Sequence, residues 1–236
     1  MEKNAAIRRS HGLLGGSPIG YHNCVVRAML APQDADSAIV SSCELMRAKA
    51  VPGSWHVGPS MRPSDLWLRL EAHGFTGAVE PGMAADLERL PDVEMPAGLQ
   101  IERIRSTTDL DSYARVLSLG FGEGAVEAAW LRTMYERIGV DNKYWQHFLG
   151  RLEGRPVATA SVLLAAGVAG LYFVNTVPAE RGRGFGTAMS RWPLIGAHDM
   201  GYRVGVLGSS PMGHGLYEQL GFHDVCEVLV YEWSPA

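Results

Sequence analysis

Three glycines within five residues, Gly182, Gly184 and Gly186, constrain this chain more than any other feature. They follow an apolar segment, 168–177, that predicts a strand, and they open a helical pattern over 184–197. Glycine permits close backbone approach and positive φ, and the first turn of a helix presents N–H groups with no intrahelical acceptor. The segment therefore predicts a strand–loop–helix site for a phosphate or diphosphate.

Other phosphate-binding loops fit this segment less well. Arg181 and Arg183 supply charges suited to phosphate oxygens. A Walker loop ends in Gly-Lys-Ser/Thr, whereas Gly186 is followed directly by Thr187. A dinucleotide fingerprint needs G-x-G-x-x-G and an acid on the next strand, and the strand predicted over 202–207 contains no acid.

The loop resembles the GCN5-related N-acetyltransferase (GNAT) family, whose signature R/Q-x-x-G-x-G/A follows a strand and is matched by R-G-R-G-F-G at 181–186. The resemblance implies that the loop amides bind the diphosphate of acetyl-CoA. It also implies that the strand splays from its neighbour and pairs with the pantetheine arm. The cofactor contacts implied in this way are Asn175, Thr176, Val177, Arg181, Gly182, Arg183, Gly184, Phe185, Gly186, Thr187 and Ser210. A glycine-rich surface turn is the alternative interpretation of the hexapeptide by itself.

A second part of the signature follows the loop. The sequence at 217–222 is Y-E-Q-L-G-F, and the family carries Y-x-x-L-G-F at about this distance. The resemblance implies that Tyr217 lies beside the CoA sulfur and protonates the departing thiolate. A phenol with a pKa of about 10 is a competent proton donor to a thiolate. Ser210 stands where the family often has Asn, and Gly205 where some members have a Glu base.

The general base is not assigned by this pattern. A protonated amine cannot attack a thioester, so a base or a water chain is required. The candidates are four residues that solvation or packing would also explain: Glu123, Glu127, His147 and His214.

Stretches rich in glycine and proline divide the chain. Residues 1–19 predict a flexible tail, and P-D-V-E-M-P-A-G at 91–98 predicts a linker. Residues 20–90 and 99–236 then form an N-terminal half and a catalytic GNAT domain.

The N-terminal half resembles a degenerate copy of the same fold, as in tandem-type members of the family. L-E-A-H-G-F at 70–75 aligns with the segment at 217–222, although so short a match also arises by coincidence. Leu70 replaces the proposed acid, and A-P-Q-D-A-D at 31–36 lacks glycine and carries two acids that would repel a diphosphate.

The expected fold class is α/β, with a mixed, mainly antiparallel twisted sheet flanked by helices and a smaller N-terminal GNAT-like half. Pro193 predicts a kink or an early end in the helix over 184–197, and Ser64 predicts a cap for a helix ending near His73. The remaining predicted strands are 21–29, 54–57, 99–104, 144–152, 157–164 and 222–233, and the remaining helices are 35–50, 110–119, 125–138 and 212–220.

Composition restricts the partners. A formal net charge of −4 argues against nucleic acid and anionic membrane, and the longest apolar run, 157–168, is shorter than the about 18 residues of a membrane helix. Three widely spaced cysteines match neither a disulfide framework nor a metal site and fit a cytoplasmic protein. A small-molecule amine is the expected acceptor, and a homodimer is a candidate assembly.

The sequence thus favours an N-acetyltransferase that moves an acetyl group from acetyl-CoA to a primary amine by direct attack. A non-catalytic module that binds CoA or acyl-CoA is the first alternative. A binder of a nucleotide or a phosphorylated sugar is the second.

Overall fold

A computed structural model describes residues 11–235. The described residues form two compact units, one of residues 11–81 with 226–235 and one of residues 82–225. Both boundaries fall inside strands, because β4 (Thr76–Asp86) and β10 (His223–Trp233) each run through both units. A separate N-terminal half is therefore not evident, and the predicted linker at 91–98 lies within the second unit.

The first unit pairs its strands in the order β1 (His11–Leu14), β2 (Asn23–Val26), β3 (Gly53–Val57), β10 and β4. Two helices, α2 (Ala35–Lys49) and α3 (Leu66–Ala72), pack on this sheet through a core centred on Trp55, Ile39 and Leu70.

The predicted tail needs correction over its described part. Residues 1–10 lie outside the described residues, but His11–Leu14 is a strand paired antiparallel with β2. The buried side chain of Asn23 accepts hydrogen bonds from the N–H groups of Gly16 and Ser17 and donates to the carbonyls of Ser17 and Pro52. These bonds fix the segment that follows β1.

The second unit pairs its strands in the order β4, β9 (Val204–Gly208), β8 (Val168–Thr176), β7 (Arg155–Ala165), β6 (Trp145–Leu152) and β5 (Leu99–Arg103). The pairs are antiparallel except β8–β9, which is parallel. This mixed sheet flanked by helices confirms the expected architecture.

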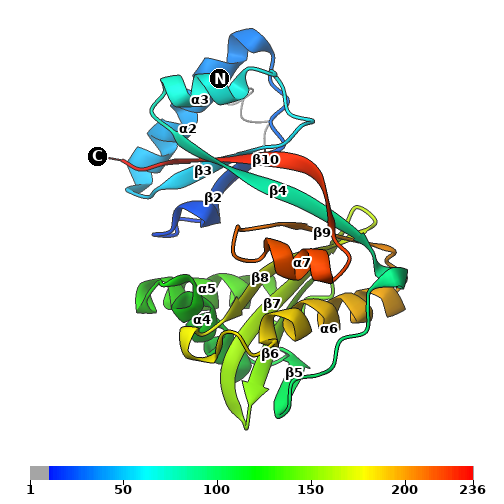
Figure 1. The fold of residues 1–236 in the computed structure, drawn as a ribbon. Helices are drawn as coiled ribbons and strands as arrows, with labels where there is room; N and C mark the ends of the chain where they lie inside the picture. The colour runs from blue at the N-terminus through cyan, green and yellow to red at the C-terminus, as the bar shows by residue number, and fades with distance from the viewer. Residues whose placement is uncertain (1–10, 236) are drawn as a thin grey trace. The chain divides into compact units, whose positions relative to one another are not determined.

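Helices cover both faces of that sheet (Figure 1). One face carries α4 (Thr107–Phe121) and α5 (Ala125–Ile138), and the other carries α6 (Phe185–Asp199) and α7 (His214–Gln219). Alternation along β7 explains the two layers. Ser161 faces α4, where it meets Tyr113, while Ala160 and Val162 belong to the core that contains α6.

Two stretches of the chain, residues 23–86 and 168–233, repeat one order of elements. The first contains β2, a 3-10 turn at Pro32–Asp34, α2, β3, α3 and β4, and the second contains β8, a 3-10 turn at Pro178–Glu180, α6, β9, α7 and β10. The long helices have 15 residues each, the last strands have 11 each, and the first and second strands of each set are parallel. In the second set a loop at 181–184 separates the 3-10 turn from the helix, whereas in the first set the helix follows directly.

Two local predictions differ from the structure. Pro193 does not end α6 early, because the helix continues to Asp199. Ser64 does not cap α3, whose N-cap residue is Asp65. Among residues 11–235, no helix is both long and apolar enough to cross a membrane.

Candidate functional site

The glycine loop joins the end of β8 to the start of α6. Gly182 and Gly184 both have φ of 77°, the left-handed region that favours glycine. Gly184 is also the N-cap of α6, and no side chain caps this helix. A Cβ on Gly186 would lie 3.1 Å from Leu216 Cδ1, so this glycine lets α6 approach α7 closely.

The loop exposes a run of unused backbone donors. The Arg181 N–H donates to the Pro178 carbonyl, and the Ala188 N–H donates to the Gly184 carbonyl. Between them, the N–H groups of residues 182–187 have no acceptor within residues 11–235. These donors lie at the positive end of the α6 dipole, an arrangement suited to a phosphate or diphosphate.

The strands beside the loop diverge. β8 and β9 pair only at Ala169–Gly205 and Gly170–Val206, although β8 continues to Thr176. The remaining length of β8 stays paired with β7 alone. The sheet therefore opens between β8 and β9 toward the glycine loop.

A bulge interrupts β8 in this open region. The register with β7 shifts between Thr159 and Ser161, which oppose Asn175 and Tyr172. The extra residue lies at Phe173, whose φ of 53° is unusual for an aromatic residue. The Thr159 hydroxyl donates to the Phe173 carbonyl over 2.9 Å and so holds the bulge.

The alternation of hydrogen bonding along β8 decides which residues near its C-terminal end have backbone groups free for a ligand. The Val177 N–H donates to the Val157 carbonyl over 2.9 Å, so Val177 has no free amide for a ligand. In an antiparallel ladder the pairs alternate, so Asn175 also faces β7, whereas Thr176 directs its backbone groups away from β7. Of the three residues expected to contact pantetheine, Thr176 is the one whose N–H faces the open side.

Protein groups already bind the two arginines of the loop. The Arg181 guanidinium donates to the carbonyls of Thr176 (3.1 Å) and Gly120 (2.7 Å). Arg183 forms an ion pair with Glu180 and stacks on the Phe185 ring, 4.9 Å from its centroid.

Glu180 organises the base of this loop. Its buried carboxylate also pairs with Arg155 on β7 over 2.5 Å, and hydrogen bonding with Arg155 lowers the pKa of Glu180. Phe185 is buried in the core, so only its backbone is available to a ligand.

The Tyr217 phenol lies against the first turns of α6. The nearby Ser190 hydroxyl donates to the Gly186 carbonyl over 2.8 Å. Burial raises the pKa of Tyr217 despite the opposing effect of Ser190, so the phenol is protonated at neutral pH. The Tyr217 ring packs on Phe222 with centroids 6.0 Å apart. The structure thus brings Tyr217 and the glycine loop to one side of α6.

Other predicted residues have local roles. The exposed Ser210 accepts a hydrogen bond from the Gly213 N–H over 3.3 Å, which closes the turn before α7. His214 pairs with Asp224 over 2.9 Å, and this hydrogen bond raises the pKa of His214, which favours the protonated imidazole that cannot accept a further proton. Among the described residues, no cluster of three or more His, Cys, Asp or Glu side chains is arranged to hold a metal ion.

His147 is a buried packing residue. It lies among Tyr113, Tyr135 and Trp145, and its Nδ1 is 2.8 Å from the Ser161 hydroxyl. Burial and, secondarily, the charge of Arg103 lower the pKa of His147 to about 3. The imidazole is therefore neutral and too weakly basic for a general base.

This depressed pKa predicts a pH dependence of stability. The unfolded chain protonates His147 below the ordinary value of 6.5, while the folded chain does not until about 3. The contribution of His147 is fully present above 6.5 and is lost as the pH falls from there toward 3. Denaturant unfolding should show wild type losing about 2 kcal/mol relative to His147→Gln between about pH 7 and about pH 5. Parallel pH curves for the two proteins would refute the assignment.

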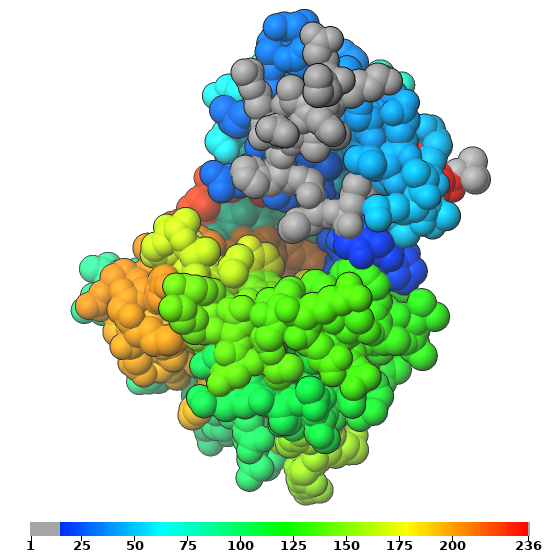
Figure 2. Space-filling model, turned by 180° about the vertical axis from the view of Figure 1, so that it is seen from behind, coloured from blue at the N-terminus to red at the C-terminus, as the bar shows by residue number. Residues whose placement is uncertain are grey.

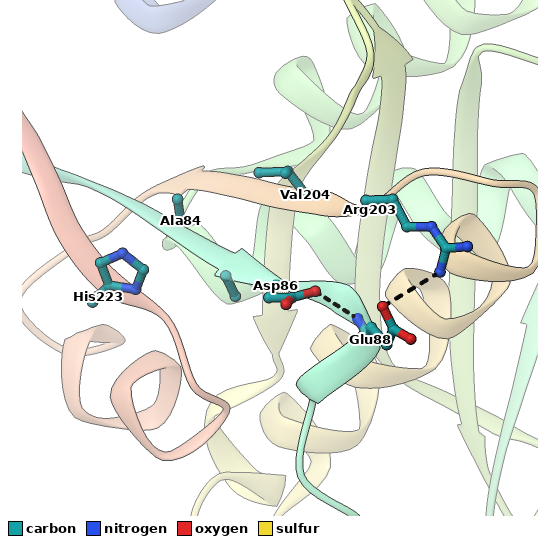
Figure 3. Close-up of a pocket in the computed structure, with 7 residues that line it drawn as sticks. Ala84, Asp86, Glu88, Arg203, Val204 and His223 are labelled. Atoms are coloured by element: carbon teal, nitrogen blue, oxygen red, sulfur yellow. Dashed lines mark hydrogen bonds and ion pairs between the residues drawn. The ribbon is translucent and has the colours of Figure 1, made fainter.

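A hollow elsewhere in the second unit is not part of this site. Its volume is about 570 Å³, and it is lined by Ala84, Ala85, Asp86, Glu88, Arg203, Val204 and His223 (Figure 3). Val204 starts β9, so the hollow lies at the opposite end of that strand from the turn before α7. Asp86 accepts the Glu88 N–H and Arg203 pairs with Glu88 over 3.8 Å, so its charged groups already have partners.

Sequence reasoning missed Ser190, Thr159 and Glu180. A weak signal existed for two of them. Ser190 lies four residues after Gly186, the spacing at which a helical serine bonds a backbone carbonyl. Glu180 precedes Arg183 by the three residues of a local ion pair.

Comparisons with known proteins identify the fold. A GCN5-related N-acetyltransferase from Kribbella flavida is similar over 100% of this chain and 93% of its own, with a TM-score of 0.70 and 18% identity. A functionally unknown conserved protein from Staphylococcus epidermidis is similar over 97% and 92%, with a TM-score of 0.72 and 11% identity. A tandem GNAT protein from the clavulanic acid biosynthesis pathway is similar over 94% and 77%, with a TM-score of 0.59 and 17% identity.

No protein-family model matches the chain, and no curated protein matches it. The chain has the GNAT fold, and at these identities the likeness concerns the fold alone.

Proposed function

We propose that the second unit is an acetyl-CoA-dependent N-acetyltransferase that acts on a primary amine. The observation that carries the proposal is the run of donors at 182–187 without acceptors among residues 11–235, at the start of the helix whose Ser190 lies near the Tyr217 phenol. A diphosphate satisfies such donors. The opening between β8 and β9, with the Thr176 N–H directed into it, suits an extended arm that continues from the diphosphate.

The chemistry is a direct transfer. The neutral amine attacks the thioester carbonyl, a C–N bond forms, and the C–S bond breaks. Tyr217 gives its phenolic proton to the departing thiolate and regains a proton from the new ammonium group through solvent. The raised pKa keeps the Tyr217 phenol protonated at neutral pH, so the residue has a proton to give to the strongly basic thiolate.

We infer further that residues 20–90 are a degenerate copy of the same module. The repeated order of elements supports this inference, and the first copy lacks a counterpart of the loop at 181–184. Near the start of α2, Asp36 pairs with Arg69 (2.5 Å) and His73 (3.2 Å). Side chains of the first unit therefore occupy this end of the helix. A carboxylate there would repel a diphosphate, and Leu70 offers no proton.

Calorimetry tests the proposal. Acetyl-CoA should bind with a stoichiometry of about one per chain, and ADP should bind at least about tenfold more weakly because it lacks the pantetheine arm. A thiol-release assay with a panel of primary amines should then detect CoA. Binding without thiol release across the panel favours the non-catalytic CoA-binding module, and equal affinity for ADP favours the nucleotide-binding alternative.

A further inference from the structure

The C-terminal end of α4 is held by more than its own backbone. Gly122 takes the left-handed conformation, with φ of 82°, and its N–H donates to the carbonyls of Leu119 and Ser118. The Glu123 N–H donates to the Ser118 carbonyl over 2.8 Å. This cap provides hydrogen bonds for the Ser118 and Leu119 carbonyls. Other carbonyls of the last turn, such as that of Gly120, receive no hydrogen bond from the cap.

Side chains from β8 and the glycine loop bind carbonyls in that turn. The Asn175 amide donates to the Leu117 carbonyl over 3.3 Å, and the Arg181 guanidinium donates to the Gly120 carbonyl over 2.7 Å. The cation also lies at the negative end of the α4 dipole. The same guanidinium donates to the Thr176 carbonyl, so Arg181 joins α4 to the end of β8.

Packing shows that this contact is specific. A Cβ on Gly120 would lie 2.1 Å from the Asn175 side-chain oxygen, so only glycine admits the amide at this point. Asn175 is 8% exposed, and its amide is directed at α4 rather than at solvent.

We propose that Asn175 and Arg181 are positioning residues that couple the cofactor loop to the α4–α5 turn at 122–124. Arg181 directly precedes Gly182, the first residue with a free amide. A ligand that orders the loop therefore also orders α4, through the hydrogen bonds to the Leu117 and Gly120 carbonyls. The inference rests on the proposed function, because that ligand is acetyl-CoA. It assigns Arg181 to the protein backbone instead of to the diphosphate that its charge suggests. The outer surface of α4 and α5 is shown in green in Figure 2, which views the molecule from behind Figure 1.

The contacts of Asn175 and Arg181 with the last turn of α4 are called the clamp. Hydrogen exchange of the ligand-free protein tests the clamp without reference to activity. Arg181→Ala should speed exchange of the Gly122 and Glu123 amides by at least about tenfold, because the last turn of α4 frays. Arg183→Ala removes the same charge from the same loop but breaks contacts with Glu180 and Phe185 rather than with α4, and it should leave these amides unchanged. Arg181→Gln keeps amide donors without the charge and should restore part of the protection. Equal exchange in the two alanine variants overturns the clamp.

Acetyl-CoA tests the coupling. The ligand should slow exchange of the Gly122 and Glu123 amides in wild type. In Arg181→Ala it should bind within about threefold of the wild-type affinity but without that slowing. A loss of affinity of about tenfold or more that Arg181→Gln shares would make Arg181 a phosphate ligand and overturn the proposal. Binding without slowing in wild type overturns the coupling and leaves the proposed function intact. If wild type binds no acetyl-CoA, the proposed function fails, and the ligand-free exchange still decides the clamp.

Discussion

Replacing Tyr217 by Phe should reduce turnover by about 100-fold or more, the range in which a positioned acid contributes. The ring keeps its packing on Phe222, and only the hydroxyl is lost. Affinity for acetyl-CoA should therefore stay within about threefold of wild type by calorimetry. The loss appears in kcat, because the interaction develops as the thiolate departs.

Tyr202→Phe is the matched control. Tyr202 packs partly buried against the same core but lies outside the candidate site, so its variant should keep wild-type turnover. Wild-type turnover in Tyr217→Phe would remove the phenol from the mechanism, and equal losses in both variants would point to packing rather than proton transfer.

Replacing both Gly182 and Gly184 by Ala should abolish most acetyl-CoA binding. Each residue has φ of 77°, where a Cβ costs about 1–2 kcal/mol. The loop should relax to negative φ, because no other interaction offsets the cost of positive φ for Ala. Its amides would then no longer point to one place. We expect the acetyl-CoA dissociation constant to rise by about 100-fold, measured by calorimetry.

Gly196→Ala on α6 is the control for this variant. Gly196 is exposed, has open space for a Cβ and lies within the helix, where Ala is favoured by about 1 kcal/mol. It should bind acetyl-CoA normally and unfold at a slightly higher temperature. Normal binding by the double variant would show that the positive-φ loop is not the diphosphate site.

Local signals in the sequence predicted the elements around the site. The glycine spacing at 182–186 and the apolar strand segments at 157–164 and 168–177 act within a few residues, and each lies where expected. Tyr217 was identified by its distance from the loop, and the fold places it against α6.

Long-range pairing accounts for what the sequence did not predict. β4 pairs with β9 and β10 pairs with β3, so both pairs join strands that lie more than 100 residues apart in the sequence. No local pattern specifies such a pairing, and the linker at 91–98 suggested a simpler division. The bulge at Phe173 places an aromatic residue at positive φ, against its intrinsic preference, and depends on Thr159 from another strand.

Residue type also misled about partners. Arg181 and Arg183 are the side chains expected at a phosphate, but the fold directs the first to backbone carbonyls and the second to Glu180. Charge alone does not distinguish a ligand from a helix end, because both present oxygen acceptors.

Crystals soaked with CoA offer the most direct test. The account predicts electron density for the diphosphate within about 2.7–3.2 Å of the amide nitrogens at 182–187, with the thiol directed toward the Tyr217 hydroxyl. Density for the diphosphate elsewhere on the chain, with those amides left to water, would contradict it.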